Sequence, residues 1–421
     1  MNAFKRRAFL KFSASAAALS AGGCASTLRS RGRVVVLGGG FGGATAAKYL
    51  RLWDPSIEVV LVEREPEFVS CPISNLVLAG FTGMQDISRG YGALRRYGVQ
   101  VVQDEALAVD AAKRTVRLAR GGEISYDRLV LSPGVDFIFS ELQGYEGAMQ
   151  AGRVLHAWKA GGQTVALRRS LEQMPDGGVV AISIPLAPFR CPPGPYERAS
   201  VIAAYFKQAK PRAKVLVLDA NPDLVSKASL FKTAWKDLYA GIIEYRPNSR
   251  AIGVDGATRT VKLELDDVKA DVLNVLPPQR AGDIAVKAGL LTSNNRWCDV
   301  DWRTMESKAV KGIHVLGDAT LSAPAMPKSA SMANNHAKIA AAAIVDLLNG
   351  REPTPFKILN TCYSFVSRDE AIRVSSVHEW EPGQGTLIAV KGSGGVSAAR
   401  SAAEGTYAWN WAKTIWADAL S

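Results

Sequence analysis

Short apolar runs, each ending at a glycine or an acidic residue, recur along this chain. Residues 33–37 are almost entirely apolar, which is typical of a strand buried on both faces of a parallel sheet. A glycine-rich turn follows at 38–43, residues 44–52 predict a helix, and a second apolar run at 57–62 predicts another strand. This order of strand, glycine turn, helix and strand predicts the beginning of a doubly wound α/β domain.

The glycine turn has the spacing of a dinucleotide-binding motif. Gly38, Gly40 and Gly43 form Gly-x-Gly-x-x-Gly, and Phe41 lies inside the motif. Glycines let the backbone approach a pyrophosphate, and the N-terminus of the following helix stabilises its charge. Glu63 ends the second strand, 25 residues after Gly38, close to the distance expected for an acid that binds a ribose 2′-hydroxyl. These residues predict an adenine dinucleotide, either FAD or NAD.

Two later segments favour FAD. Residues 314–319 predict a strand that ends in Gly317-Asp318, and residues 129–134 predict a strand followed by Ser-Pro-Gly, with Gly134 last. Both segments resemble motifs of flavoproteins that have two dinucleotide domains. In that family the aspartate binds the ribityl chain of FAD, and the middle motif marks where the chain leaves the FAD domain. Three such motifs in this order imply FAD.

The second half of the chain lacks a repeat of the glycine motif. A strand expected at 178–184 leads into a proline-rich loop at 185–195 that has no Gly-x-Gly-x-x-Gly. Proline donates no backbone N–H, so this loop is a poor phosphate cradle. Another strand is expected at 214–219, as in a second βαβ unit. We therefore expect a Rossmann-like domain that does not bind a nicotinamide cofactor, and a smaller electron donor for the flavin.

The expected fold class is α/β, with two Rossmann-like dinucleotide-binding domains arranged as in glutathione reductase and a C-terminal α+β domain. Strands expected at 361–366, 372–377 and 385–390 belong to the last of these. The expected boundaries are 1–31 for an export segment, 32–143 and 281–351 for the FAD domain, 144–280 for the second domain, and 352–421 for the C-terminal domain.

Composition excludes several classes of protein. Hydrophobic residues make up 48% and charged residues 21%, which excludes a mainly disordered chain. Five cysteines in 421 residues are too few for a small disulfide scaffold, and no apolar run reaches the roughly 20 residues that span a bilayer. The net charge is +12, of which residues 1–31 supply six charges, and no basic run with interleaved aromatics indicates nucleic acid. The four histidines lie too far apart in sequence for metal-ligand spacing.

Residues 1–31 have the pattern of an export signal. Lys5-Arg6-Arg7 precede Phe-Leu-Lys at 9–11 and an Ala-rich apolar stretch at 12–21, which resembles the twin-arginine class. A basic amphipathic helix of the folded protein is the alternative. The signal predicts a periplasmic protein, in a compartment where disulfides persist. Cys24 has small neighbours, which suit either simple cleavage nearby or lipoprotein acylation.

The cysteines suggest redox chemistry. Cys191 lies in the Pro/Gly loop ahead of an expected helix, which suits a reactive thiol or a structural cysteine. Cys362 follows the Gly-Asp motif and a long helix expected at 329–348, and Cys71 follows the strand that ends at Glu63. Cys298 has no supporting context, and we interpret it as structural.

Together these segments resemble the flavoprotein subunit of flavocytochrome c sulfide dehydrogenase. The resemblance is carried by Cys71, the Cys-Pro-Pro-Gly-Pro-Tyr-Glu motif at 191–197, Gly317-Asp318, Pro-Lys-Ser at 327–329, Thr-Cys-Tyr-Ser at 361–364, and the aromatic tail at 409–415. It implies a thioether between Cys71 and the 8α-methyl group of FAD, and a redox-active disulfide between Cys191 and Cys362. The chain has no Cys-x-x-Cys-His, so a c-type haem is expected on a partner cytochrome subunit and not here.

The implied reaction is the oxidation of sulfide. Hydrosulfide can attack a disulfide sulfur, which leaves a persulfide and a thiolate, and the thiolate can reduce the flavin. Glu197, six residues after Cys191, is either an acid/base group or a helix-start residue that accepts backbone N–H groups. Lys328 either lies near the carbonyl end of the flavin, where it stabilises the reduced anion, or is a surface lysine. His336 either faces the flavin or packs in the core.

Two other functions remain open. A sulfide:quinone oxidoreductase uses a related disulfide and should carry an amphipathic C-terminal membrane helix, which Trp409, Trp411, Ile415 and Trp416 leave possible. The export signal argues against this class. A non-catalytic electron-transfer flavoprotein of sulfur oxidation is the other alternative, and sulfide-dependent bleaching of the flavin distinguishes it from an enzyme.

Overall fold

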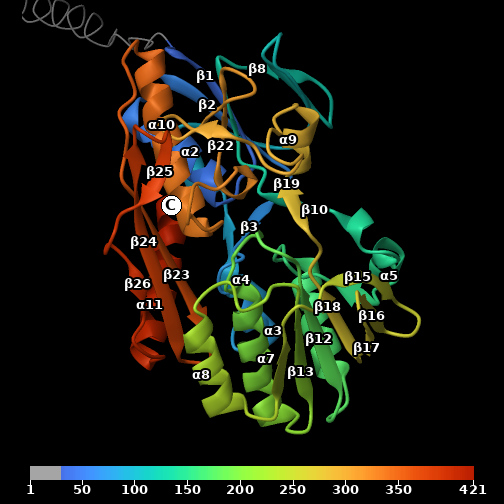
Figure 1. Ribbon diagram of the computed structural model, residues 1–421. Helices are drawn as coiled ribbons and strands as arrows, with labels where there is room; N and C mark the ends of the chain where they lie inside the picture. The colour runs from blue at the N-terminus through green and yellow to red at the C-terminus, as the bar shows by residue number, and fades with distance from the viewer. Residues whose placement is uncertain (1–29) are drawn as a thin grey trace, which may run out of the picture.

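The computed structural model describes residues 30–421, and the twin-arginine prediction falls on residues 1–29, outside the described part of the chain. Figure 1 shows two α/β regions, one above the other. The upper region holds the blue N-terminal strands, and the lower one holds the green central helices and strands. The red C-terminal segment runs along one side of both regions.

The upper region is built on a seven-stranded sheet in the order β20-β21-β22-β9-β1-β2-β5. The strands are β20 (Val300–Asp301), β21 (Glu306–Ser307), β22 (Ile313–Val315), β9 (Arg128–Leu131), β1 (Gly32–Leu37), β2 (Ile57–Glu63) and β5 (Val99–Gln103). The five strands from β22 to β5 are parallel. Leu37 pairs with Val62 and Leu131, and Leu131 pairs with Val315, so four strands end at the same edge. The segments that follow them, which contain the dinucleotide motifs, meet at this edge.

Two helices, α2 (Phe41–Trp53) and α10 (Ala330–Leu348), pack against each other beside this sheet. The helix α2 begins three residues earlier than predicted, because the last two glycines of the motif already belong to its first turn. Ser329 caps α10, since its Oγ accepts the Met332 N–H at 3.0 Å. The two helix starts therefore lie next to the carboxyl ends of the parallel strands.

The lower region is a second parallel sheet in the order β11-β18-β12-β13-β14. Its strands are β11 (Val154–Leu155), β18 (Val272–Val275), β12 (Val179–Ile184), β13 (Lys214–Asp219) and β14 (Ile243–Arg246), and its helices are α6 (Gly162–Gln173), α7 (Gly194–Ala209) and α8 (Ala228–Tyr239). The strands expected at 178–184 and 214–219 are β12 and β13. The expectation of a second Rossmann-like domain is confirmed.

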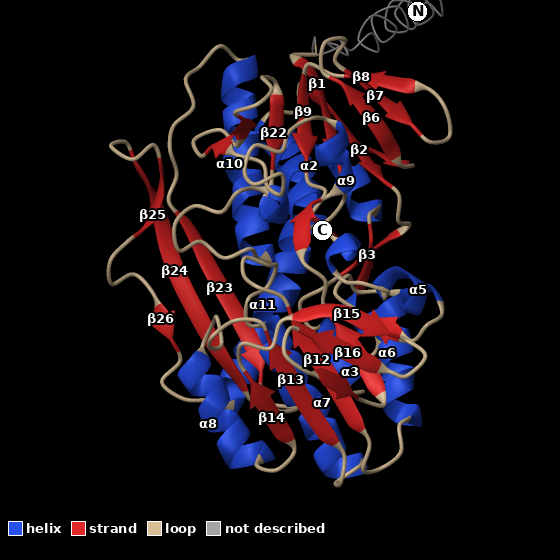
Figure 2. Ribbon diagram, turned by 45° about the vertical axis from the view of Figure 1, so that its right-hand side comes forward, coloured by secondary structure: helices blue, strands red, loops and turns tan. Residues whose placement is uncertain are grey.

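The C-terminal region is an antiparallel sheet followed by a helix. It contains β23 (Ile358–Phe365), β24 (Ala371–Glu381), β25 (Thr386–Ala389), β26 (Gly395–Val396) and α11 (Ala402–Leu420). Figure 2 shows β23 and β24 as long strands along the side of both α/β regions. The strand β23 contacts α10 above and α7 below, and α11 packs on α2. The C-terminal region therefore holds the two α/β domains in one arrangement.

Shorter elements complete the described chain. They are β3 (Glu67–Val69), β4 (Ser88–Gly90), β6 (Ala106–Asp110), β7 (Thr115–Leu118), β8 (Glu123–Ser125), β10 (Val135–Phe137), β15 (Ala251–Asp255), β16 (Thr260–Leu263), β17 (Asp267–Lys269), β19 (Gln279–Ala281), α3 (Ser74–Leu78), α4 (Met84–Ile87), α5 (Tyr145–Gln150) and α9 (Asp283–Lys287). The strands β10 and β19 pair where the chain passes between the two α/β domains. Within residues 30–421, no helix combines the length and apolar character needed to cross a membrane.

Candidate functional site

A cavity of about 570 Å³ lies where the two α/β domains and the C-terminal sheet meet. Its wall contains ten of the residues predicted from the sequence: Gly40, Phe41, Glu63, Cys71, Gly134, Cys191, Glu197, Gly317, Asp318 and Cys362. Gly38, Gly43 and Lys328 lie outside this wall. The convergence follows from the topology, because the strands of the first sheet end at one edge and α7 and β23 reach the same place.

At two positions the glycine turn lies too close to backbone atoms to hold a side chain. Gly38 has a φ of +95°, and a Cβ there would lie 2.5 Å from the carbonyl oxygen of Ser132. A Cβ on Gly43 would lie 1.8 Å from the carbonyl oxygen of Gly38. Gly40 differs, since an added Cβ would meet nothing within 4 Å. The open space at Gly40 lies at the N-terminus of α2, where a pyrophosphate fits.

Glu63 lies beside this turn at the end of β2. Its Oε2 accepts the Gly39 N–H at 2.5 Å, and its Oε1 accepts the Glu65 N–H at 2.8 Å. These bonds hold the carboxylate at the cavity wall, next to the glycine turn. This is the place at which an acid binds the ribose hydroxyls of an adenine dinucleotide.

Asp318 presents an unpartnered carboxylate oxygen in the same cavity. Its Oδ1 is buried and has no hydrogen-bond partner among residues 30–421. Burial raises the pKa of this carboxyl, while Arg190 and Lys328 act in the opposite direction. A buried carboxylate oxygen without a donor is costly, so a ligand hydroxyl that donates to Oδ1 fits the site. The ribityl hydroxyls of FAD supply such donors.

Lys328 is buried, so its interpretation as a surface lysine is wrong. Its Nζ donates to the carbonyl oxygens of Asp318 at 3.0 Å and Thr320 at 2.5 Å, and lies 3.7 Å from the centroid of the Trp297 ring. Burial lowers the pKa of Lys328 to about 8. The ammonium therefore supports the turn that carries Asp318, and its direct contact with a flavin stays a prediction.

Cys191 and Cys362 come together in this cavity from two different domains. Cys191 lies in the loop before α7 with a φ of 57°, and its N–H donates to the Lys328 carbonyl at 2.9 Å. Cys362 lies on β23, opposite Val374 of β24. Both side chains are half-buried free thiols in the structure. Both thiols line the same cavity, and the interaction between them shifts the pKa of each.

The two neighbouring thiols differ in acidity. The interaction with Cys362, together with burial, raises the pKa of Cys191 well above its usual value. The interaction with Cys191 lowers the pKa of Cys362 to about 7, and the positive charge of Lys227 acts in the same direction. In the dithiol form the negative charge therefore belongs on Cys362.

Cys71 lies on the wall of the same cavity, in the segment between β3 and α3. Its Sγ is 3.9 Å from the carbonyl oxygen of Trp158. Ile73, two residues later, has a φ of 74° and precedes the first residue of α3. Pro72 and this left-handed residue turn the chain sharply, so that Cys71 faces the cavity. By contrast, Cys298 is fully buried outside the cavity wall, in agreement with a structural role.

Glu197 does not cap its own helix, although it lies in the first turn of α7. Its Oε1 accepts the Phe365 N–H of β23 at 2.7 Å, and its Oε2 accepts Asn75 Nδ2 at 2.8 Å. Burial raises the pKa of its carboxyl, and these two donors together with Lys227 and Arg198 oppose the rise. Glu197 does accept a backbone N–H, but that N–H belongs to Phe365 in the C-terminal domain and not to the start of α7. The helix-start interpretation is therefore wrong about the hydrogen-bond partner.

The acidic residue at the corresponding strand end of the second domain already has protein partners. Asp219 ends β13, the position that corresponds to Glu63 in the first domain. Its Oδ2 accepts the hydroxyls of Tyr196 at 2.7 Å and Tyr245 at 3.2 Å, and its Oδ1 accepts the Asn221 N–H at 2.9 Å. The carboxylate is fully buried by these partners. It is not available to the ribose of NAD, in agreement with the proline-rich loop that follows β12.

The histidine on α10 packs in the core. His336 is buried on α10, where its Nδ1 accepts the Gly317 N–H at 3.2 Å and its ring packs edge-on against Trp302. Burial lowers its pKa to about 3. The packing role is thus the one that the contacts support. Across the described range 30–421, no group of three or more His, Cys, Asp or Glu side chains could hold a metal ion.

Several residues at this site carry no signal in the sequence. Arg198 is buried, donates to the Asn75 side chain at 3.1 Å and to the carbonyls of His156 and Ala157, and lies 4.9 Å from the centroid of the Trp158 ring. A second residue, Lys227, approaches Cys362 from the start of α8. None of them belongs to a recognisable motif, because their positions depend on how three separate segments meet. Arg198 could have been noticed only as the neighbour of Glu197.

Comparison with known proteins agrees with this geometry. Residues 32–167 match the family model for pyridine nucleotide-disulphide oxidoreductases. Residues 164–277 match the model "Sulfide dehydrogenase [flavocytochrome c] flavoprotein chain, central", and residues 354–420 match "Flavocytochrome c sulphide dehydrogenase, flavin-binding". Fold and site together define a flavin-dependent oxidoreductase with two dinucleotide-type domains.

Individual relatives narrow this class. The flavoprotein chain of the flavocytochrome c sulfide dehydrogenase of Chlorobaculum thiosulfatiphilum is 69% identical over 45 residues, which are 11% of this chain and 94% of that sequence. The mitochondrial sulfide:quinone oxidoreductase of Mus musculus is 24% identical over 315 residues, 71% of this chain and 68% of that one. The solved sulfide:quinone oxidoreductase of Aquifex aeolicus has the same fold, with a TM-score of 0.74, 20% identity and coverage of 92% of this chain and 91% of that one.

This chain belongs to the family of flavocytochrome c sulfide dehydrogenase flavoprotein chains. It is an FAD-binding oxidoreductase of the sulfide-oxidising flavoproteins.

Proposed function

We propose that this chain oxidises sulfide with a disulfide between Cys191 and Cys362 and passes the electrons through FAD to a c-type cytochrome subunit. One observation carries the proposal. Cys191 and Cys362 are 171 positions apart in the sequence, yet they are neighbours on the wall of a cavity that Cys71 also lines. Three cysteines from three parts of the chain thus surround one space, at the edge where the FAD motifs end.

The first step is thiol–disulfide exchange. Hydrosulfide forms a new sulfur–sulfur bond to one cysteine, and the bond between Cys191 and Cys362 breaks. One cysteine then carries a persulfide and the other a thiolate. Bound FAD supplies the chemistry that accepts an electron pair and releases electrons singly. Overall, hydrosulfide loses two electrons and one proton, and its sulfur leaves at the oxidation level of elemental sulfur or polysulfide.

The residues around the pair suit this chemistry. Arg190 and Arg198 line the cavity, so positive charge surrounds an entering hydrosulfide anion. Glu197 lines the cavity as well, and its raised pKa makes it able to hold the proton that hydrosulfide releases. The two hydrogen bonds to its carboxylate keep it oriented beside the cysteines.

The flavin is proposed to be bound covalently. A thioether from Cys71 to the 8α-methyl group of FAD agrees with the place of Cys71 on the cavity wall. The glycine turn, Glu63 and Asp318 bind the remaining parts of the cofactor. The family resemblance supports the linkage. It leaves Cys191 and Cys362 free to pair with each other.

A cytochrome acceptor and a periplasmic location are part of the same proposal. The Chlorobaculum relative is named as the flavoprotein chain of a flavocytochrome, and this chain itself has no Cys-x-x-Cys-His for a c-type haem. The twin-arginine-like residues 1–31 support export to a compartment in which a disulfide persists. Quinone is the second candidate acceptor, favoured by the similarity to sulfide:quinone oxidoreductases over most of the chain.

The test is anaerobic mixing of the purified holoprotein with sulfide, followed by the flavin absorbance. We expect rapid bleaching in the wild type and in a Cys298→Ala control, and none in Cys191→Ser or Cys362→Ser, all with FAD still bound. Normal bleaching in both serine variants would refute the disulfide mechanism. Absence of bleaching in the wild type would favour a non-catalytic electron-transfer flavoprotein.

The acceptor is tested in the same preparation. Sulfide-dependent reduction of a c-type cytochrome, with little reduction of a short-chain ubiquinone, is the expected result. The opposite preference would assign the chain to the quinone-reducing class.

A further inference from the structure

Lys227 is a buried lysine that lies next to the cysteine pair. It precedes α8 with a φ of 54°, in the left-handed region of backbone conformation, and only 7% of its surface is exposed. Its side chain extends from the second domain, and its ammonium group contacts residues of the C-terminal sheet. Burial of an ammonium group is expensive unless hydrogen bonds and negative charge compensate it.

The hydrogen bonds of Lys227 are complete. Its Nζ donates to Ser364 Oγ at 2.8 Å, to the carbonyl oxygen of Cys362 at 3.2 Å and to that of Ile372 at 3.5 Å. Three acceptors match the three protons of an ammonium group. The geometry therefore fits the charged form, held at the backbone of Cys362 itself.

The charge of Lys227 has no carboxylate partner at ion-pair distance among residues 30–421. Burial lowers the pKa of Lys227, and the negative or ionisable groups that oppose the fall are Cys362 on β23, Glu197 on α7, Cys191 in the loop before α7, and Glu404 on α11. Glu197 already accepts two hydrogen bonds from other donors. In the disulfide form the two cysteines carry no charge. When the sulfur–sulfur bond opens, a thiolate on Cys362 supplies a negative charge next to the Lys227 ammonium.

We propose that Lys227 is a positioning residue that stabilises negative charge on Cys362 when the Cys191–Cys362 bond is opened, and that it thereby favours the reduced form of the pair. The inference rests on the proposed disulfide chemistry and adds the residue that sets its redox balance. Reduction of the disulfide takes up two electrons and one proton, and it yields a Cys191 thiol and a Cys362 thiolate. A cation beside the thiolate makes a disulfide easier to reduce, because it stabilises the product.

The first experiment follows the thiolate directly. The reduced holoprotein is alkylated with iodoacetamide between pH 5.5 and 9.5, and the rate at Cys362 is read by mass spectrometry. We expect a midpoint near neutral pH in the wild type and in Lys227→Arg. In Lys227→Met we expect it to rise by about one pH unit or more, which is a tenfold fall in the acid dissociation constant of Cys362.

The second experiment measures the redox balance. The oxidised holoproteins are equilibrated with dithiothreitol at pH 8, and the fraction of reduced pair is counted after quenching. The equilibrium constant for reduction should fall about fivefold in Lys227→Met, which corresponds to about 20 mV. Lys227→Arg should stay near the wild type, because the positive charge is kept.

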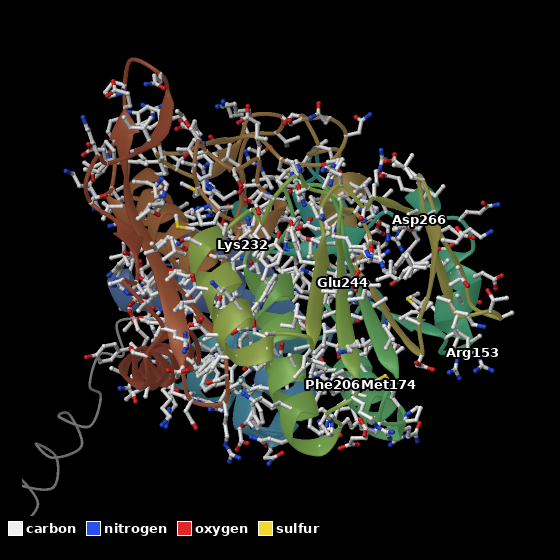
Figure 3. All side chains as sticks on the ribbon, turned by 60° about the horizontal axis from the view of Figure 1, so that its bottom comes forward. Arg153, Met174, Phe206, Lys232, Glu244 and Asp266 are labelled. Carbon is white, nitrogen blue, oxygen red and sulfur yellow. The ribbon has the colours of Figure 1, made fainter. Side chains whose placement is uncertain are left out.

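Two further variants separate charge from structure. Lys232, labelled on α8 in Figure 3, is an exposed lysine paired with Asp223 at 2.7 Å, so Lys232→Met removes an exposed positive charge from the helix that follows Lys227. It should leave both measurements unchanged. Lys227→Gln retains an amide donor for the Cys362 carbonyl, and it serves as the neutral variant if Lys227→Met does not fold.

The outcomes distinguish this inference from the proposed function. If neutral variants keep the wild-type alkylation midpoint and equilibrium constant, the role of Lys227 is refuted, whatever the activity. If the wild type forms no Cys191–Cys362 disulfide or is not reduced by sulfide, the proposed function fails instead.

Discussion

The carboxylate of Glu197 on α7 accepts the backbone N–H of Phe365 on β23 at 2.7 Å. Glu197 follows Cys191 by six residues and Phe365 follows Cys362 by three, so this hydrogen bond joins the two cysteine-bearing segments. The other carboxylate oxygen accepts Asn75 Nδ2 at 2.8 Å, in the segment just after Cys71. One buried side chain therefore fixes the relative positions of all three cavity cysteines.

This carboxylate should make stability depend on pH. Burial raises the pKa of Glu197 above its ordinary value of 4.5, so above about pH 4.5 the native protein binds more protons than the unfolded chain. The free energy of unfolding then falls as pH rises through this window. Glu197→Gln should lack the decline, which amounts to about 1.4 kcal/mol for each tenfold gain in proton affinity.

Urea unfolding of the FAD-loaded wild type and Glu197→Gln, from pH 5 to pH 8, measures this difference. Glu244→Gln, an exposed glutamate on β14 that is labelled in Figure 3, is the control and should follow the wild type. Parallel curves for the wild type and Glu197→Gln would show that the pKa of Glu197 is not raised.

Asp318→Ala should have opposite effects on cofactor binding and on the stability of the apoprotein. In a Cys71→Ser background, from which FAD can be removed, loss of the carboxylate should weaken FAD binding roughly 10- to 100-fold, as expected for a hydrogen bond to a charged group. The apoprotein at pH 8 should become more stable, because burial raises the pKa of this unpartnered carboxyl. Equal FAD affinity with and without the Asp318 carboxylate, both measured in the Cys71→Ser background, would show that Asp318 does not bind the cofactor.

The flavin should remain on the protein after acid precipitation, with its mass on the peptide that contains Cys71. Cys71→Ser should release all of its flavin into the supernatant while it still binds FAD before precipitation, because the glycine turn and Asp318 are unchanged. Release of all flavin from the wild type would disprove the thioether and leave FAD binding intact.

Neither NADH nor NADPH should reduce the flavin at a useful rate. The Asp219 carboxylate is occupied by Tyr196, Tyr245 and Asn221, and the loop after β12 offers prolines where a phosphate needs backbone N–H groups. Anaerobic mixing with each nucleotide, with sulfide as the positive control, gives the answer. Rapid bleaching by NADH would move the protein to the NADH-dependent class.

The sequence predicts those parts of the molecule whose chemistry is local. Gly38, Gly43 and Glu63 could be placed because one βαβ unit determines where they lie, and β12 and β13 could be recognised as buried strands by their apolar runs. The loop at 185–195 could be interpreted from proline alone. The alternatives for Glu197 could not be resolved, because its partners Phe365 and Asn75 lie more than 100 residues away in the sequence. Those for Lys328 could not be resolved either, because its burial depends on tertiary packing that no motif reports.

Lys227 and Arg198 show why the remaining site residues were missed. Each is a single basic residue without a motif, and each acquires its role only where α8, α7 and β23 come together. Lys227 ends at the Cys362 carbonyl, 135 residues further along the chain, and no periodicity reports such a contact. Long-range packing determines these positions. The sequence motifs therefore identify the cysteines, but they do not identify the basic residues that lie next to them.

The contact between α2 and α11 has a consequence for the order in which the molecule is assembled during translation. Lys48 emerges from the ribosome early, and its acceptors at Ala417 and Asp418 lie on a helix that follows every other described element. Before α11 docks, β23 lacks one of its supports, and the wall that carries Cys362 is incomplete. Two residues of α11, Ala408 and Trp411, also line the cavity directly. The cavity wall is therefore complete only after the last described helix has been translated.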